Sequence, residues 1–154
     1  MNWQPPTPYT YQAPAPPPAT RSGFTPAAFV AIGCAVILLI GSFMPWVSVR
    51  TAFGNMSVGG LEGDGKLTAA AAVGAIALVA GGAAGRIRVL IALGSIAGAI
   101  GAALAAYDIF DISDKIGDMD NEFARASVGV GLYVCLLSGI ATFISGMIAQ
   151  SEIR

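Results

Sequence analysis

The chain has 154 residues, of which 55% are hydrophobic and only 11% are charged, and its net charge at pH 7 is −1. Soluble domains carry about 25% charged residues, so the charges here are too few to solvate the surface of a soluble fold of this size. The near-zero net charge excludes a nucleic-acid binder with a basic surface, and the absence of histidine removes the commonest general base and metal ligand.

The N-terminal residues 1–26 are rich in proline, with no charged segment leading into a short apolar core as in a signal peptide. Proline lacks a backbone N–H group and interrupts helices, so this stretch predicts a disordered or extended cytoplasmic tail. Residues 5–8 and 14–17 each have the PxxP spacing of a docking motif. A flexible spacer is the alternative interpretation.

Four apolar segments follow, at about residues 27–46, 67–85, 89–107 and 127–149. Each reaches or nearly reaches the roughly 20 residues that cross a hydrocarbon core about 30 Å thick. The pattern predicts an all-α membrane protein, a bundle of four transmembrane helices that ends in a short tail at residues 150–154. No ionisable residue falls near the centre of a segment, which argues against a pump or coupled transporter.

The orientation follows from the loops. Four crossings place both termini on one side, and Arg86 and Arg88 occupy the very short loop between the second and third segments. Basic residues in short loops favour the cytoplasm, so we expect a multi-pass protein of the cell membrane with both termini cytoplasmic. Cys34 and Cys135 lie in different segments at depths that differ by roughly 10 Å, so no disulfide is expected.

Small residues recur at four-residue spacing on three of the segments. In lipid, helices associate where small side chains let the backbones approach closely. We expect these positions to pack helices within one bundle, with dimerisation as the alternative: Gly81, Gly85, Gly94, Gly98, Ser138, Thr142 and Gly146.

The loop between the first two segments predicts an extracytoplasmic β-hairpin. Residues 47–53 are β-prone, Gly54-Asn55 is a two-residue turn signal, and residues 56–58 return. This turn would pair Phe53 with Met56 and Thr51 with Val58. One face of the hairpin, which packs on the bundle or contacts a partner, would then carry Val49, Thr51, Phe53, Met56 and Val58.

The loop between the last two segments is acidic, and its apolar residues recur at spacings of three and four, as on one face of a helix. It predicts an acidic amphipathic helix, formed either as a continuation of the third segment or as a separate helix across the outer surface. The apolar face begins at Ile109, and its remaining members complete the candidate partner surface: Ile112, Ile116, Met119 and Phe123.

Two ligand motifs are incomplete. Residues 60–67 resemble a phosphate-binding loop, but Leu67 stands where a magnesium-binding Ser or Thr should follow Lys66. A calcium site at Asp114, Asp118, Asp120 and Glu122 lacks the glycine of an EF-hand. Without histidine no Ser-His or Cys-His pair can form. We therefore expect no catalytic residues, no metal and no cofactor, and the chain is predicted not to be an enzyme.

The layout as a whole carries a resemblance. A Pro/Tyr/Gln-rich tail precedes a first segment that ends Met44-Pro45-Trp46-Val47-Ser48-Val49, and a Gly-rich hairpin and three Ala/Gly-rich segments follow. This order resembles the small four-span membrane proteins of actinobacteria and their temperate phages. Some phage-encoded proteins of this kind act in superinfection exclusion, so the resemblance implies that role as one function.

Three functions remain open from the sequence. The first is a non-enzymatic binding or scaffold protein that sits in the lipid bilayer and meets a protein partner in the membrane or envelope. The second is a phage-encoded superinfection-exclusion or defence protein. The third is a holin-like protein that permeabilises the membrane, which would require a homo-oligomer. None of them involves nucleic acid.

Overall fold

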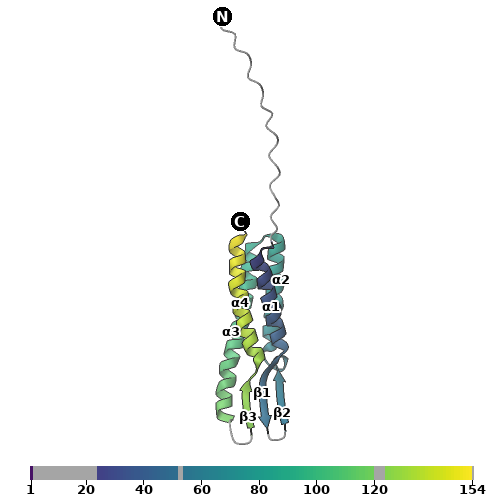
Figure 1. Ribbon diagram of the computed structural model, residues 1–154, viewed down its shortest axis with the longest axis vertical. Coiled ribbons are helices and arrows are strands. Elements are labelled where there is room, and N and C mark those ends of the chain that lie inside the picture. Colours follow the sequence, from purple (N-terminus) through teal and green to yellow (C-terminus); the bar gives the residue numbers. More distant parts are fainter. Residues whose placement is uncertain (2–23, 52–53, 120–123, 154) are drawn as a thin grey trace.

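Four long helices and a small antiparallel sheet make up the fold (Figure 1). The structure, a computed structural model, describes residues 1, 24–51, 54–119 and 124–153. The helices are α1 (Pro26–Phe43), α2 (Gly65–Gly85), α3 (Arg88–Met119) and α4 (Val130–Glu152). The strands are β1 (Pro45–Thr51), β2 (Gly54–Gly59) and β3 (Ala124–Val128), and a short 3-10 helix, η1 (Gly60–Glu62), leads into α2. The proline-rich tail lies almost entirely outside the described residues.

The four predicted apolar segments are confirmed as helices that are long and apolar enough to cross a membrane. Thr25 caps α1 by accepting a hydrogen bond from the Ala28 N–H at 3.2 Å, and Pro26 follows in the first turn. The predicted end of the first segment at residue 46 is wrong. The helix stops at Phe43 because Pro45 has no N–H to donate and disfavours helical backbone at the residue before it.

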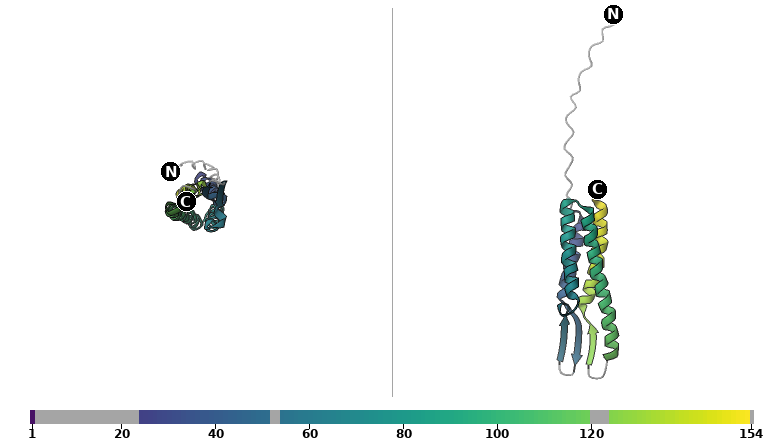
Figure 2. Two further views of the ribbon diagram at one scale, coloured as in Figure 1. Left: turned by 90° about the horizontal axis from the view of Figure 1, so that it is seen from below. Right: turned by 180° about the vertical axis from the view of Figure 1, so that it is seen from behind.

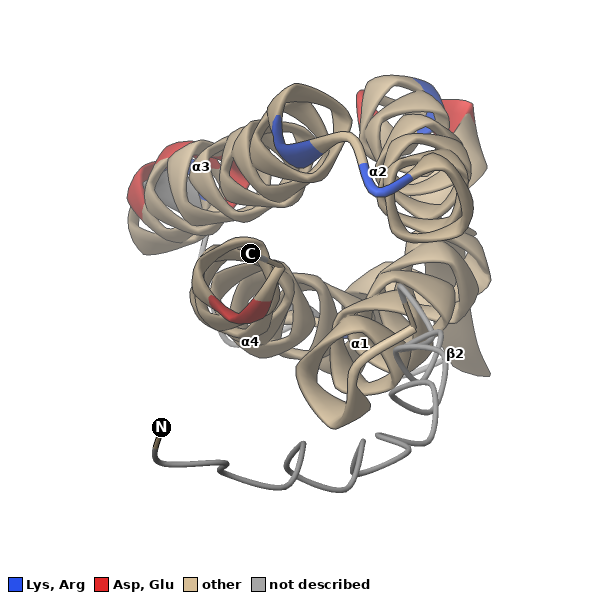
Figure 3. Ribbon diagram, turned by 90° about the horizontal axis from the view of Figure 1, so that it is seen from above, with Lys and Arg blue, Asp and Glu red and all other residues tan. Residues whose placement is uncertain are grey.

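The helices form a ring in which each packs against its neighbour in sequence and α4 closes against α1 (Figure 2, left; Figure 3). At one end of the ring, Phe24 and Ala27 pack against a buried cluster that includes Ile153. Arg88 Nε donates a hydrogen bond to the Ile153 carbonyl at 2.5 Å, which ties the start of α3 to the end of α4. The start of α1 and the end of α4 therefore lie at the same end of the bundle.

Close contacts between helices occur at several of the predicted small residues. A Cβ on Gly94 would lie 2.7 Å from Val79 Cγ2 and 3.0 Å from the Val79 nitrogen, so α3 can approach α2 only without a side chain there. A Cβ on Gly98 would lie 2.7 Å from Cγ2 of Thr142 on α4. These residues are thus used for contacts within the chain.

Of the remaining predicted packing residues, some lie in contacts between helices and others lie at the exposed surface. Ser138 and Gly146 are buried, and Gly146 lies against Ser95 of α3. Gly81 and Gly85 are exposed instead. Gly82 makes the contact on this helix, because a Cβ there would lie 2.9 Å from the Ile91 nitrogen.

Helix α3 is much longer than the others. Its 32 residues compare with 18, 21 and 23 in α1, α2 and α4. At 1.5 Å per residue it is about 48 Å long and extends beyond the bundle beside β3 (Figure 2, right). Of the two predicted forms of the acidic segment, the structure shows the continuous helix.

The sheet has the order β2-β1-β3, so β1 is central. Val49 pairs with Met56, Val47 with Val58, and Thr51 with Gly54. The predicted register, with Thr51 opposite Val58 and a turn at Gly54-Asn55, is therefore wrong. The chain reverses between Thr51 and Gly54, and Phe53 lies outside the described residues. The partner of each residue shifts by four positions, from Phe53 to Val49 opposite Met56, and an even shift leaves every side chain on its expected face.

Strand β3 has no counterpart in the sequence prediction, which began the fourth helix at residue 127. Residues 124–128 instead pair antiparallel with β1, from Val47 opposite Val128 to Thr51 opposite Ala124. The fourth helix starts at Val130, directly after Gly129.

Substitution of Gly94 by leucine tests the close approach of α2 and α3. Gly94→Leu should lower the free energy of unfolding by at least about 2 kcal/mol, because backbone atoms as well as Val79 must move. Gly33→Leu is the matched control, since nothing lies within 4 Å of a Cβ on Gly33. Thermal unfolding of the purified variants in detergent would measure both, and equal melting temperatures would contradict the packing.

Candidate functional site

The sheet joins the bundle at Trp46, which is 4% exposed. Its indole Nε1 donates a hydrogen bond to the Gly41 carbonyl at 3.2 Å, back in the last turn of α1. A Cβ on Gly60 would lie 2.5 Å from the indole ring, and one on Gly131 would lie 2.9 Å from Cδ1. Glycine is therefore required where the chain enters α2 and where α4 begins, because each passes against the tryptophan.

Backbone hydrogen bonds close the same junction. The Gly60 N–H donates to the Met44 carbonyl at 3.1 Å, and the Gly129 N–H donates to the Trp46 carbonyl at 2.6 Å. Three separate segments of the chain thus meet at one point, and the sheet is fixed to the end of the helical bundle.

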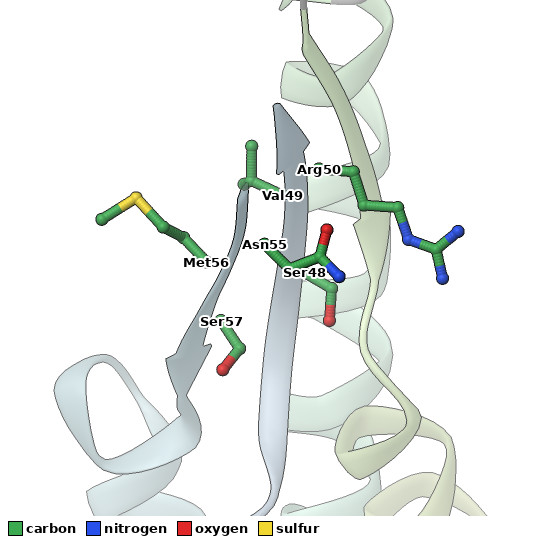
Figure 4. Close-up of a pocket in the computed structure, with 6 residues that line it drawn as sticks. All are labelled: Ser48, Val49, Arg50, Asn55, Met56 and Ser57. Atoms are coloured by element: carbon green, nitrogen blue, oxygen red, sulfur yellow. The ribbon is translucent and has the colours of Figure 1, made fainter. Parts of the chain in front are cut away.

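The two faces of the sheet differ in polarity. One face carries a row of serines across the three strands, because Ser48 pairs with Ser57 on one side and Ser127 on the other. The Ser127 hydroxyl donates to the Ser48 carbonyl at 3.3 Å. A shallow pocket of about 150 Å³ lies over β1 and β2 and is lined by Ser48, Val49, Arg50, Asn55, Met56 and Ser57 (Figure 4).

The opposite face carries the predicted partner residues of the hairpin. Met56 and Val58 on β2 are 73% and 42% exposed, whereas Val49 and Thr51 on β1 are half-buried. Strand β2 lies at the edge of the sheet, with β1 as its only strand neighbour among the described residues. Among the side chains of this face that the structure describes, the exposed ones lie on the edge strand.

The predicted partner residues of the acidic segment lie elsewhere. Ile112, together with Ile109, packs against the buried cluster that contains Trp46. Ile116 is half-buried on the same helix, while the side chain of Met119 and the whole of Phe123 lie outside the description. The described isoleucines thus hold the extension of α3 against the rest of the chain, and the hairpin edge is the more open surface.

Four buried polar side chains lie towards this end of the bundle, one on each helix, and the sequence analysis did not identify them as a group. They are Ser42, Thr68, Asp108 and Cys135. The Ser42 hydroxyl donates to the Leu38 carbonyl at 3.0 Å, and the Cys135 thiol lies 4.0 Å from the Ser42 oxygen. Thr68 Oγ1 and Asp108 Oδ2 have no hydrogen-bond partner in the described structure.

Asp108 lies level with the start of α2. It is 20 residues past the start of α3 at Arg88, and Gly65 is 20 residues before the end of α2 at Gly85. Asp108 is only 8% exposed although three of the four helices begin or end at this level. The carboxylates of Asp64 and Asp111 are close enough to act on Asp108 electrostatically.

The packing of α3 accounts for the burial of Asp108. Asp108 follows Ala105 by three positions, and Ala105 is fully buried, so both lie on the inward face of α3. The sequence alone does not show this, because it depends on α3 continuing as a helix through Asp108.

The described residues contain no group of three or more His, Cys, Asp or Glu side chains that could hold a metal ion. Of the residues in the incomplete calcium motif, Asp114 is exposed. Asp120 and Glu122, and the side chain of Asp118, are outside the described part. In the loop that resembles a phosphate-binding motif, Lys66 is exposed at the start of α2. Both cysteines are free thiols.

Comparison with known proteins adds no relative. No protein-family model matches the chain, and neither the curated proteins nor the solved structures contain a significant match.

The tryptophan junction can be tested with a graded pair of variants. Trp46→Phe should cost about 1 kcal/mol, since it loses the hydrogen bond to Gly41 and part of the ring. Trp46→Ala should cost about 3–5 kcal/mol because it leaves a cavity at the contact of three segments. Phe110→Ala, which removes a 72% exposed ring, is the control and should change little. Thermal unfolding in detergent would rank the three variants by their loss of stability. Similar losses for all three would refute the role of Trp46 at the junction.

Proposed function

We propose that the chain is a non-enzymatic integral membrane protein that crosses the cell membrane four times and binds a protein partner through its sheet. The termini would lie in the cytoplasm, and the sheet with the extension of α3 would lie on the outer side. The proposal has two parts, insertion with this orientation and recognition at the sheet.

Exposed apolar side chains on the helices support insertion. They point away from the bundle on every helix, with examples in Phe29, Ile40, Val73, Ile100 and Leu137, which are 62%, 55%, 54%, 52% and 68% exposed. A surface of this kind is stable in lipid and unfavourable in water. The orientation is supported by Arg86 and Arg88, which lie in and next to the short connection at the end that carries the termini (Figure 3).

The open edge of β2 is the observation that carries the binding proposal. Edge strands present unpaired backbone N–H and C=O groups, and proteins commonly protect them with lysine, proline or a covering element. The sequence of β2, Gly54–Gly59, contains neither lysine nor proline, and Met56 and Val58 on it are exposed. We expect a partner to add an extended segment to this edge, with apolar side chains at alternate positions that contact these two residues.

Crosslinking in intact cells tests this surface. A photoreactive residue at Met56 should give a defined heteromeric adduct, whereas one at Ser113, which is exposed at the same end on α3, should not. The double substitution Met56→Glu and Val58→Glu, with the photoreactive residue at Ser57, should reduce the adduct at least about tenfold, because burying unpaired carboxylates is costly.

The size of the adduct distinguishes the partners. An adduct of twice the mass of the chain would identify a second copy, the homo-oligomer that a permeabilising function requires. An adduct from Ser113 but none from Met56 or Ser57 would reject the β2 edge as the binding surface.

A further inference from the structure

The buried polar group at the sheet end of the bundle has unsatisfied oxygen atoms. Thr68 is fully buried on α2 and Asp108 is 8% exposed on α3, yet Thr68 Oγ1 and Asp108 Oδ2 have no partner in the described structure. A buried polar atom without a hydrogen bond destabilises the fold, and a buried charge does so more strongly. Two such atoms at the same end of one bundle indicate that something absent from the protein chain itself satisfies them.

The position of both side chains is inward. Thr68 lies one turn from Ala72 and Asp108 lies one turn from Ala105, and both alanines belong to the buried cluster around Trp46. The Asp108 carboxylate is also close enough to α4 for its charge to act on the thiol of Cys135. The group therefore faces the interior between α2, α3 and α4.

The charges around Asp108 are negative. Asp64 at the start of α2 and Asp111 on α3 act on it most strongly, and Cys135 is the ionisable group that faces it from α4. Helix α1 contains no charged residue. The described lysines are engaged elsewhere or exposed: Lys115 Nζ lies 2.6 Å from Asp111 Oδ2, and Lys66 faces outward. No basic side chain among the described residues neutralises Asp108.

The chemistry favours a single positive charge. Carboxylate and hydroxyl oxygens are ligands for hard cations. One buried carboxylate balances one charge, and the described residues offer no group of three acidic or other metal-ligating side chains for a divalent ion. We propose that Asp108 and Thr68 form a cation site at the sheet end of the bundle that binds a sodium ion in competition with a proton.

The competition follows from the carboxyl group. Only the ionised carboxylate can balance a sodium ion, so sodium binds Asp108 at about pH 8 and a proton displaces it at low pH.

The test uses the full-length protein in detergent, with sodium replaced by N-methyl-D-glucamine at constant ionic strength. At about pH 8 the melting temperature should rise with sodium and saturate, and towards about pH 4 the rise should be lost. Asp108→Asn should remove the sodium dependence, whereas Asp114→Asn, an exposed carboxylate on the same helix, should keep it. A sodium effect that is absent, or that is equal at both pH values or in Asp108→Asn, overturns the site.

A second variant keeps the proposal testable if Asp108→Asn does not fold. Thr68→Val keeps the size of the side chain and removes the unpartnered hydroxyl, so without sodium it should be at least as stable as the native protein. With sodium it should require about fivefold more ion for half of the effect, the loss expected for one hydrogen-bonding ligand. An unchanged sodium dependence in Thr68→Val would overturn the role of Thr68 and with it the two-residue site.

Discussion

The sheet has a fixed position because the chain passes three times against one side chain, Trp46. The indole is held by its hydrogen bond to Gly41, and the segments that lead into α2 and α4 pass it at Gly60 and Gly131. Larger residues at these two glycines would force those segments away from the ring. The connections after α1, before α2 and before α4 are thereby coupled, although they are far apart in the sequence. Isolated strands of five to seven residues gain little stability in water, and here the sheet gains it from this shared anchor.

The asymmetry of the sheet follows from the length of α3. Helices α1, α2 and α4 end near one level, and only α3 continues, with Ile109 and Ile112 packed against the cluster that contains Trp46. This continuation lies beside β3 and covers one side of the sheet, as Figure 1 shows. Strand β2, at the opposite edge, receives no such cover from the described residues. A single long helix thus protects one edge and leaves the other available, which is why the proposed binding surface is reduced to Met56, Val58 and the β2 backbone.

Features that depend on local composition could be predicted from the sequence. Features that depend on contacts between distant segments could not. The four helices were predictable because each consists of a long run of apolar residues, which is visible in the local sequence. The register was not: Gly54-Asn55 is a strong local turn signal, but β1 pairs on both sides, and the contact with β3 is invisible in a local window. Strand β3 was missed because Ala-Arg-Ala-Ser-Val is short and borders an apolar helix. The inward position of Asp108 was equally hidden, since it depends on α3 continuing as a helix through a stretch of acids that has the composition of a solvated loop.

The polar side chains inside the bundle differ sharply along its length. Ser95, Ser138, Thr142 and Ser145 each donate a hydrogen bond to a carbonyl four residues earlier on their own helix, so they are satisfied without any ligand. The apolar side chains of Val79, Ile91, Leu38 and Leu132 are fully buried. A permeabilising function would therefore need a passage between copies, because the interior of one copy is filled by apolar side chains and self-bonded hydroxyls. Among the described residues, the buried side-chain oxygens without a hydrogen-bond partner are Thr68 Oγ1 and Asp108 Oδ2. The proposed cation site therefore lies at the end where the helices meet the sheet.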